Sequence, residues 1–351
     1  MKLLLIPFSY IFRIIVFIRN ILYNKGFLKV NELTPNVISV GNIAAGGTGK
    51  TPFVELLAEY LLDKGKFIVI VLKGYKREHD DMKVVELGFQ NENHELNIEN
   101  FGDEAFVLLE NLSKIKSGKG LLVVGDEKTK AAKFASVKFK PEIIIIDDGF
   151  QHRKLYRDLD IVIINPHQNK HLIPAGNLRE PVKNIHRANI IVVNNKFDKD
   201  IINENIQNKP RIICNYEFEG FINIKNETLS AAEITKAAVF CGIGEPGSFI
   251  KLLEGLNIKI REFIKFPDHH YFSINDINKI IESYNKSGAK YVLTTQKDFV
   301  RIKNSEVVLK AASDNAYKNL LFNYPLYYAK IKMQINQNAE LLHKEIDDLL
   351  N

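Results

Sequence analysis

A glycine-rich segment near the N-terminus carries residue types that bind phosphate. It lies between an apolar run at 36–40 and a stretch with helical spacing at 51–64. Glycines let backbone N–H groups turn toward phosphate oxygens, and the start of a helix adds partial positive charge. The Lys50 ammonium can reach the β- and γ-phosphates of a nucleotide, and the Thr51 hydroxyl can bind Mg²⁺. The residues predicted to bind nucleotide are Ala44, Ala45, Gly46, Gly47, Thr48, Gly49, Lys50 and Thr51.

One position departs from the strict phosphate-loop pattern, which has glycine where this chain has Ala44. The adjacent glycines Gly46 and Gly47 are expected to supply the missing freedom. The alternative interpretation is a glycine-rich turn between a strand and a helix that binds no ligand.

Two adjacent acids follow four isoleucines, in the run Ile143–Ile146 and then Asp147-Asp148. A buried parallel strand that ends in Asp is typical of the metal-side carboxylate of a phosphate-loop enzyme, so Asp147 is a predicted Mg²⁺ ligand. Successive side chains of a strand point to opposite faces, so Asp148 is expected to face the substrate. The alternative is that these acids only cap the turn after the strand.

Two further clusters leave alternatives open. Asp103 and Glu104 begin a helical stretch, where acids also stabilise the helix dipole. The run Asp268-His269-His270 can position a histidine for proton chemistry, but a pair of loop histidines looks the same in sequence. A zinc site is not favoured, because no third ligand lies at the usual spacing.

Short apolar runs alternate with helical stretches along the chain, which predicts an α/β fold. We expect a doubly wound parallel sheet of the phosphate-loop type, a second, smaller α/β domain and an N-terminal interfacial helix. The expected boundaries are 1–25 for the helix, 26–215 for the nucleotide-binding core and 216–351 for the smaller domain. Residues 78–100 are polar and irregular, which favours a surface loop or a small hairpin.

The composition limits the function classes. The 351 residues are 46% hydrophobic and 26% charged, which is globular, and 48 Lys and Arg against 42 Asp and Glu give a net charge of +6. There is no basic tail with interleaved aromatic residues, so nucleic acid is not an expected partner. The two cysteines, Cys214 and Cys241, form no metal or disulfide pattern, which favours a reducing cytoplasm.

The N-terminal stretch 3–18 is strongly apolar but contains Arg13, and Arg19 and Lys25 follow it. A transmembrane helix needs about 20 apolar residues, and a signal peptide ends in a cleavage site of small residues. The interruption by charge favours a helix that lies in the membrane interface, with its basic residues near lipid phosphates. The alternative is an ordinary buried first helix.

A competing signal comes from Asn195-Lys196-Phe197-Asp198, which follows a predicted strand and matches the pattern by which GTPases recognise guanine. A GTPase would also have Asp-x-x-Gly at the metal-side strand, and Asp147-Asp148-Gly149-Phe150 does not fit that pattern. Two rival hypotheses therefore accompany a kinase: a GTP-dependent switch, and an ATPase that positions a membrane-bound partner.

Taken in order, these stretches resemble the tetraacyldisaccharide 4′-kinase family of lipid A biosynthesis over nearly the whole chain. The motifs that carry the resemblance are Gly46–Pro52, Gly102–Glu104, Asp147–His152, Arg157–Asp160, Pro174–Glu180, Phe266–His270 and Thr294–Asp298. The chain departs from the family at Lys73-Gly74-Tyr75-Lys76-Arg77, where the family has Arg-Gly-Tyr-Gly-Arg. Arg77 is kept and stays a predicted phosphate contact, whereas the change to Lys73 makes a phosphate contact there less certain.

The resemblance implies that ATP phosphorylates the 4′-hydroxyl of a lipid disaccharide 1-phosphate, with Mg²⁺, to give lipid IVA. It implies Asp103 as the base, His269 as the group that orients it, and Lys50 as a catalytic cation. Thr51, Asp147 and Glu104 become the metal candidates. The substrate candidates are Arg77, Asp148, Gln151, His152, Asn177, Arg179 and Glu180.

The substrate implied by the resemblance also gives a location. We expect a monomer without an obligate protein partner, bound peripherally to the cytoplasmic face of the inner membrane. We further expect the smaller domain to bring His269 across the cleft and to close when nucleotide binds.

Overall fold

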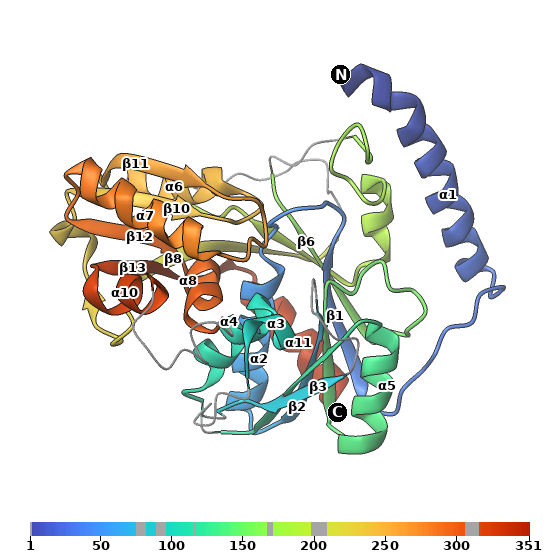
Figure 1. The fold of residues 1–351 in the computed structure, drawn as a ribbon. Coiled ribbons are helices and arrows are strands. Elements are labelled where there is room, and N and C mark those ends of the chain that lie inside the picture. The colour runs from blue at the N-terminus through green and yellow to red at the C-terminus, as the bar shows by residue number, and fades with distance from the viewer. Residues whose placement is uncertain are drawn as a thin grey trace.

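The computed structural model describes residues 2–74, 82–88, 96–115, 117–166, 171–197, 209–305 and 316–351. One 13-stranded sheet runs through it in the order β11-β10-β12-β13-β8-β7-β6-β1-β5-β2-β4-β3, with β9 paired to β8 (Figure 1). The strands are β1 Asn36–Asn42, β2 Phe67–Lys73, β3 Lys83–Glu86, β4 Lys119–Gly125, β5 Ile143–Asp147, β6 Leu159–Ile164, β7 Ile190–Asn194, β8 Arg211–Ile222, β9 Thr228–Leu229, β10 Lys236–Cys241, β11 Lys259–Lys265, β12 Tyr291–Thr295 and β13 Leu326–Gln337.

The sheet consists of two parallel halves. β4, β2, β5, β1, β6, β7 and β8 run parallel to their neighbours, and so do β13, β12, β10 and β11. The antiparallel pair β8–β13 joins the halves, from Tyr328↔Ile222 to Gln337↔Ile213. The carboxyl ends of the parallel strands in each half therefore share an edge, where ligands of open α/β sheets bind.

Helices cover the sheet. They are α1 Ile6–Asn24, α2 Lys50–Asp63, α3 Ile98–Phe101, α4 Asp103–Leu112, α5 Lys128–Phe139, α6 Pro246–Gly255, α7 Ile274–Ser287, α8 Gln296–Lys303, α10 Ala316–Asn323 and α11 Ala339–Leu350, with 3-10 helices η1 Lys2–Leu5, η2 Val182–Arg187 and η4 Ala231–Glu233. In the first half of the sheet, α2, α4 and α11 lie on one face and α5 lies on the other (Figure 1).

The isoleucine run of β5 explains why this strand is central. Ile143 and Ile145 pack in the cluster that includes α2 and α4, whereas Ile144 and Ile146 pack in the cluster that includes α5. A strand covered on both faces has no polar side to present, so it reads as a continuous apolar run.

The predicted α/β fold with a mainly parallel sheet and an N-terminal apolar helix is confirmed. The division at residue 215 stays a prediction; strands on both sides of it belong to one sheet. The interpretation of 78–100 as loop or hairpin was wrong where the structure describes it: Lys83–Glu86 is an edge strand antiparallel to β4, and Ile98–Phe101 is a helical turn. Neither segment is long enough to show a periodicity.

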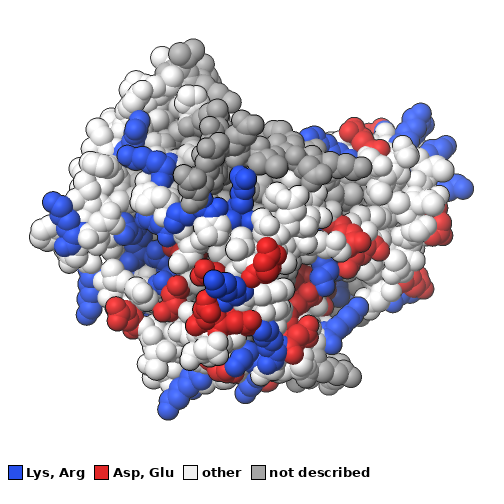
Figure 2. Space-filling view, turned by 180° about the vertical axis from the view of Figure 1, so that it is seen from behind, with Lys and Arg blue, Asp and Glu red and all other residues white. Residues whose placement is uncertain are grey.

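α1 lies beside the first half of the sheet, and the N-terminus is at its far end (Figure 1). Of its 19 residues only Ser9, Val16 and Asn20 are buried, and it is the one helix in the described part of the chain that is long and apolar enough to cross a membrane. In the view from behind, this edge of the molecule shows uncharged side chains with several Lys and Arg among them, while Asp and Glu gather over the lower centre and the opposite side (Figure 2).

Candidate active site

The phosphate loop connects β1 to α2 and is held in place by three neighbouring segments. Asn42 at the end of β1 donates from Nδ2 to Thr48 Oγ1 (2.7 Å), and Asn194 at the end of β7 donates to the Thr48 carbonyl (2.9 Å). The backbone N–H of Ala45 donates to the Asn177 carbonyl (2.7 Å). The loop is therefore fixed before any ligand arrives, which lowers the entropic cost of binding phosphate.

Gly49 precedes α2 and has to be glycine for two reasons. Its φ is +97°, in the left-handed region, and a Cβ there would lie 2.2 Å from Asn194 Nδ2 and 2.6 Å from the Tyr216 hydroxyl. Burial raises the pKa of Tyr216 to about 12, so this hydroxyl stays neutral next to the loop. The sequence motif predicted Gly49, but it gave no sign of Asn194 or Tyr216.

Three oxygen-bearing side chains converge behind Lys50. Thr51 Oγ1 lies 3.4 Å from Glu104 Oε1 and 3.5 Å from Asp147 Oδ2. Thr51 comes from the first turn of α2, Glu104 from the first turn of α4 and Asp147 from the end of β5. The three predicted metal candidates are thus brought together by three separate elements.

The buried carboxyl of Asp147 tests whether this group suits a divalent cation. Its Oδ1 is buried and accepts no hydrogen bond from any residue that the structure describes. Burial, reinforced by the charge of Glu104, raises the pKa of Asp147 to about 7. A cation would satisfy the orphaned oxygen and favour the ionised carboxylate, and hard oxygen ligands with open positions suit Mg²⁺. The residues fit the metal.

Asp103 begins α4 and is 7% exposed. His269 Nδ1 lies 3.2 Å from Asp103 Oδ2, and Arg301 of α8 donates from Nε to the same oxygen (2.9 Å) and also contacts it through Nη2. Arg301 is in turn held by the Gly242 carbonyl (2.7 Å) and by Asp298 Oδ1 (2.9 Å). The structure therefore places Asp103 and His269 together, although 166 positions separate them in sequence.

The surroundings of Asp103 set its protonation state. Burial alone would raise its pKa, but the charge of Lys297, the hydrogen bond to His269 and the charge of Arg301 together lower the pKa well below the ordinary value. Asp103 is thus an ionised acceptor throughout the physiological range. It can hold and orient a hydroxyl group that donates to it.

Several predicted substrate residues lie around Lys50. Asp148 lies 3.5 Å from Lys50 Nζ and accepts a hydrogen bond from Arg179 Nη1 (2.8 Å). Burial opposes ionisation of Asp148, but Lys50, Lys128 and Arg179 lower its pKa below the usual range. Two other predicted residues bond to the loop backbone: Gln151 donates to the Asn42 carbonyl (2.6 Å) and Asn177 to the Ala45 carbonyl (3.5 Å).

The remaining predicted residues differ in their surroundings. Burial and the nearby charge of Lys128 lower the pKa of His152 to about 4, so its ring is neutral. Glu180 does not line the site: it is 0% exposed and bonded to Arg19, Asn20, Asn184 and Arg187, so its placement on the sugar side is corrected. Arg77 lies outside the described residues.

Sequence reasoning missed three cations near the carboxylates: Arg301, described above, and two lysines. Lys128 is 2% exposed and donates to the Asp148 carbonyl (2.9 Å), and burial lowers its pKa. Lys297 lies 3.0 Å from Glu104 Oε1; burial opposes its charge, but Glu104 and Asp103 raise its pKa above the usual value. Lys297 stands inside the Thr294–Asp298 motif, which was the available signal for it.

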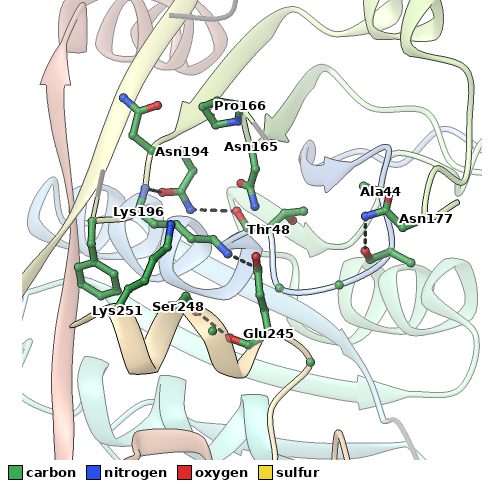
Figure 3. A pocket seen from close by; sticks show the side chains of 17 residues that line it. Ala44, Thr48, Asn165, Pro166, Asn177, Asn194, Lys196, Glu245, Ser248 and Lys251 are labelled. Atoms are coloured by element: carbon green, nitrogen blue, oxygen red, sulfur yellow. Dashed lines mark hydrogen bonds and ion pairs between the residues drawn. The ribbon is translucent and has the colours of Figure 1, made fainter. Parts of the chain in front are cut away.

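A cavity of about 560 Å³ opens beside the phosphate loop (Figure 3). Its walls are loop residues 44–48, the segment 194–197 after β7, and the start of α6, where Glu245 pairs with Lys196. Asn195 is 3% exposed, and neither its amide nitrogen nor its amide oxygen has a hydrogen-bond partner among the described residues. The predicted phosphate loop thus adjoins a space of ligand size.

Comparisons with known proteins show which family the chain resembles along its whole length. The family described as Tetraacyldisaccharide-1-P 4′-kinase matches residues 1–351. A Tetraacyldisaccharide 4′-kinase of Aquifex aeolicus (strain VF5) is 36% identical over 334 residues, which cover 92% of this chain and 98% of the relative; one from Halothermothrix orenii is 32% identical over 359 residues, with 94% and 88% covered. A crystal structure of the "apo" form of LpxK from Aquifex aeolicus in complex with ATP has a TM-score of 0.76 at 32% identity and covers 100% of this chain and 99% of its own.

Proposed function

This chain belongs to the tetraacyldisaccharide-1-P 4′-kinase family, and from that premise we propose which of its residues perform each part of the reaction. The chain is a kinase that uses ATP to phosphorylate the 4′-hydroxyl of a tetraacyldisaccharide 1-phosphate, a precursor of lipid A. One observation carries the assignment of roles. The proposed metal group of Thr51, Glu104 and Asp147 and the proposed base Asp103 meet at the start of α4, where Asp103 and Glu104 are adjacent.

On the donor side, the phosphate loop binds the β- and γ-phosphates through its backbone N–H groups, and Lys50 neutralises charge that develops on the γ-phosphate. Thr51, Glu104 and Asp147 would hold Mg²⁺, which would supply further charge neutralisation to the phosphates. Lys297 lies 3.0 Å from Glu104 Oε1, and its positive charge offsets the repulsion between the adjacent carboxylates of Glu104 and Asp103.

On the acceptor side, Asp103 accepts a hydrogen bond from the 4′-hydroxyl and holds its oxygen in line with the γ-phosphate. Phosphoryl transfer passes through a loose transition state, so alignment matters more than early removal of the proton. A carboxylate with a strongly lowered pKa suits this role. His269 contacts the same carboxylate oxygen and fixes its orientation. Closure of the smaller domain on nucleotide binding stays a prediction.

Asp148 and Arg179 form the border between donor and acceptor, because Asp148 approaches Lys50 and Arg179 at once. Arg179 presents a planar fork that suits phosphate oxygens. We assign two loops to the acceptor sugar: 148–153, which carries Gln151 and His152, and 171–180, which carries Asn177 and Arg179.

The base of the nucleotide occupies the cavity beside the loop. The walls of this cavity come from loop residues 44–48, the segment 194–197 and the start of α6, and its volume of about 560 Å³ has room for a purine. Lys196 of the competing GTPase-like pattern pairs with Glu245, and Asp198 lies outside the described residues. We therefore assign the segment 194–197 to adenine and not to a guanine-dependent switch.

Transfer of labelled phosphate tests the proposal. The protein is incubated with Mg²⁺, a tetraacyldisaccharide 1-phosphate in detergent micelles, and either γ-labelled ATP or γ-labelled GTP. We expect label on the lipid from ATP at a rate at least about tenfold above that from GTP, the difference that one matched base contact provides. Release of inorganic phosphate without labelled lipid would support an ATPase instead, and equal or faster transfer from GTP would contradict the adenine assignment.

We also propose that the outward face of α1 binds the membrane interface. Ile11, Ile14 and Ile18 are 56%, 57% and 51% exposed and follow one another at helical spacing. Replacing all three with serine should reduce co-sedimentation with anionic vesicles by at least about tenfold, because several apolar side chains no longer enter the acyl boundary. Unchanged vesicle binding by this triple variant would contradict the membrane role of α1.

A further inference from the structure

α1 buries polar side chains against the protein and leaves most of its large apolar side chains exposed. Two of its three buried residues, Ser9 and Asn20, are polar; Phe12 and Leu22 are half-buried beside them. A helix held to a core by hydrophobic contact would bury the apolar stripe. The contacts of the inner face therefore need another explanation.

The inner face of α1 bonds to the two loops that we assign to the acceptor. Ser9 Oγ donates to the Leu172 carbonyl (2.9 Å) and accepts from the Ala175 N–H (3.1 Å). Arg153 donates to the Asn20 carbonyl (3.1 Å) and to Asn24 Oδ1 (2.7 Å).

Glu180 is the central tether between α1 and the second of these loops. It is fully buried and accepts hydrogen bonds from Asn20 Nδ2 (3.2 Å) and Arg19 Nη2 (2.9 Å) of α1, and from Arg187 Nη2 (2.9 Å). Asn184 Nδ2 also donates to it (2.8 Å), so α1 supplies two of the four donors that the structure describes. A buried carboxylate needs such compensation, so the docking of α1 helps to hold Glu180 and its loop in position.

The same loop reaches the phosphate-binding site from its other side. Arg179, the residue before Glu180, donates its backbone N–H to the Ile43 carbonyl (2.7 Å) and its guanidinium to Asp148 (2.8 Å). Asp148 is 3.5 Å from Lys50 Nζ. A continuous series of short polar contacts thus runs from α1 through Glu180 and Arg179 to the catalytic lysine.

We infer that α1 is a positioning element of the acceptor site as well as a membrane anchor, and that Ser9 and Asn20 are its positioning residues. The two functions lie on opposite faces of one helix and are separable by mutation. The inference rests on the proposed function, because it takes 148–153 and 171–180 as the acceptor loops.

Two variants test the separation in detergent micelles, where membrane binding is not needed to meet the substrate. Asn20→Leu keeps the branching of the side chain at Cγ but removes the donor to Glu180. We expect the KM for the lipid acceptor to rise about tenfold, the effect of one lost charge-assisted hydrogen bond, while the Kd for ATP changes less than about twofold and vesicle binding is kept. The matched control, serine at Ile11, Ile14 and Ile18, should lose vesicle binding and keep its KM in micelles.

The retained ATP affinity of the variant shows that it is folded. Ser9→Ala, which removes the tether to Leu172 and Ala175, provides a second and milder variant and should raise the same KM. An unchanged acceptor KM in both variants, or a Kd for ATP that rises in parallel with KM, would overturn the inference.

Amide hydrogen exchange supplies a readout that does not depend on activity. Amides of 149–153 and 171–180 should exchange about tenfold faster in Asn20→Leu, because the loops lose their tether, while those of β5 and α2 are unchanged. Unchanged exchange would count against the inference. Failure of the proposed function looks different, because the wild-type protein would then transfer no label to the lipid while the exchange result still decides the role of α1.

Discussion

Replacing Asp103 with asparagine should lower kcat by about 10³-fold, within the usual range for the loss of a positioned acid–base group. Asparagine keeps the shape of the side chain but removes the charge that Arg301 and His269 contact, so the 4′-hydroxyl loses its charged acceptor. The Kd for ATP should change little, because no contact of the phosphate loop involves Asp103. Steady-state kinetics with the lipid acceptor and separate titration with ATP measure the two effects.

Glu110 provides a matched control for Asp103. It lies on the same helix, and its carboxylate pairs with Lys303 at 2.7 Å on a part of α4 away from the loop. Glu110→Gln should leave kcat within about twofold, as expected for a partly exposed ion pair. An Asp103→Asn variant that loses ATP affinity and kcat to the same degree would contradict the acceptor role.

The pKa of Asp103 adds a statement about pH. Since this pKa is held well below its usual range, Asp103 stays ionised in any buffer that keeps the protein folded. We expect no decrease of kcat that can be assigned to Asp103 between about pH 5 and pH 9. An acidic limb that disappears in Asp103→Asn would show that the carboxylate titrates in this range.

Asp147→Asn is expected to have the second largest effect, a decrease of kcat by at least about 10², because a direct ligand of the proposed Mg²⁺ is lost. The variant keeps the strand intact, since asparagine has nearly the same volume and the neutral form is no costlier to bury. Binding of Mn²⁺ in the presence of ATP, followed by electron paramagnetic resonance, should weaken by at least about tenfold.

Asp158→Asn is the control for this change. Asp158 is the last residue of the connection between β5 and β6. It accepts a hydrogen bond from the Val37 N–H (2.8 Å), at the end of β1 that lies away from the phosphate loop. It should leave Mn²⁺ binding and kcat unaltered. If Asp147→Asn binds Mn²⁺ as the wild type does, Asp147 is not a metal ligand.

Parts of the site could be predicted because local sequence contains their cause. The phosphate loop needs glycines next to a helix start, and β5 is an apolar run that ends in Asp. Each of these two features is contained in one short stretch of sequence. The contact between Asp103 and His269 is different, because nothing local joins two segments 166 positions apart; only the resemblance to a family paired them.

Other parts had no local signal. Arg301 and Lys128 are 3% and 2% exposed, yet each occupies an ordinary helical stretch in which a basic residue is expected to face water. Glu180 is the opposite case, a residue that was predicted to contact the substrate and does not line the site. Its place beside Arg179 suggested a substrate contact, but the side chain turns to α1, and a carboxylate buried by a distant helix cannot be recognised from its neighbours in sequence.

β8 leads out of the nucleotide-binding half of the sheet and β13 leads back into it, so the chain between residues 223 and 325 is an insertion whose ends lie side by side. After it, α11 returns to the first half, where Leu342 and Ile346 are fully buried. We expect that this insertion can rotate as a unit about the β8–β13 pair while both ends of the chain stay packed in the first half of the sheet. Because the insertion carries His269, such a rotation would change the distance to Asp103 and leave the bonds of Asn42 and Asn194 to the phosphate loop as they are.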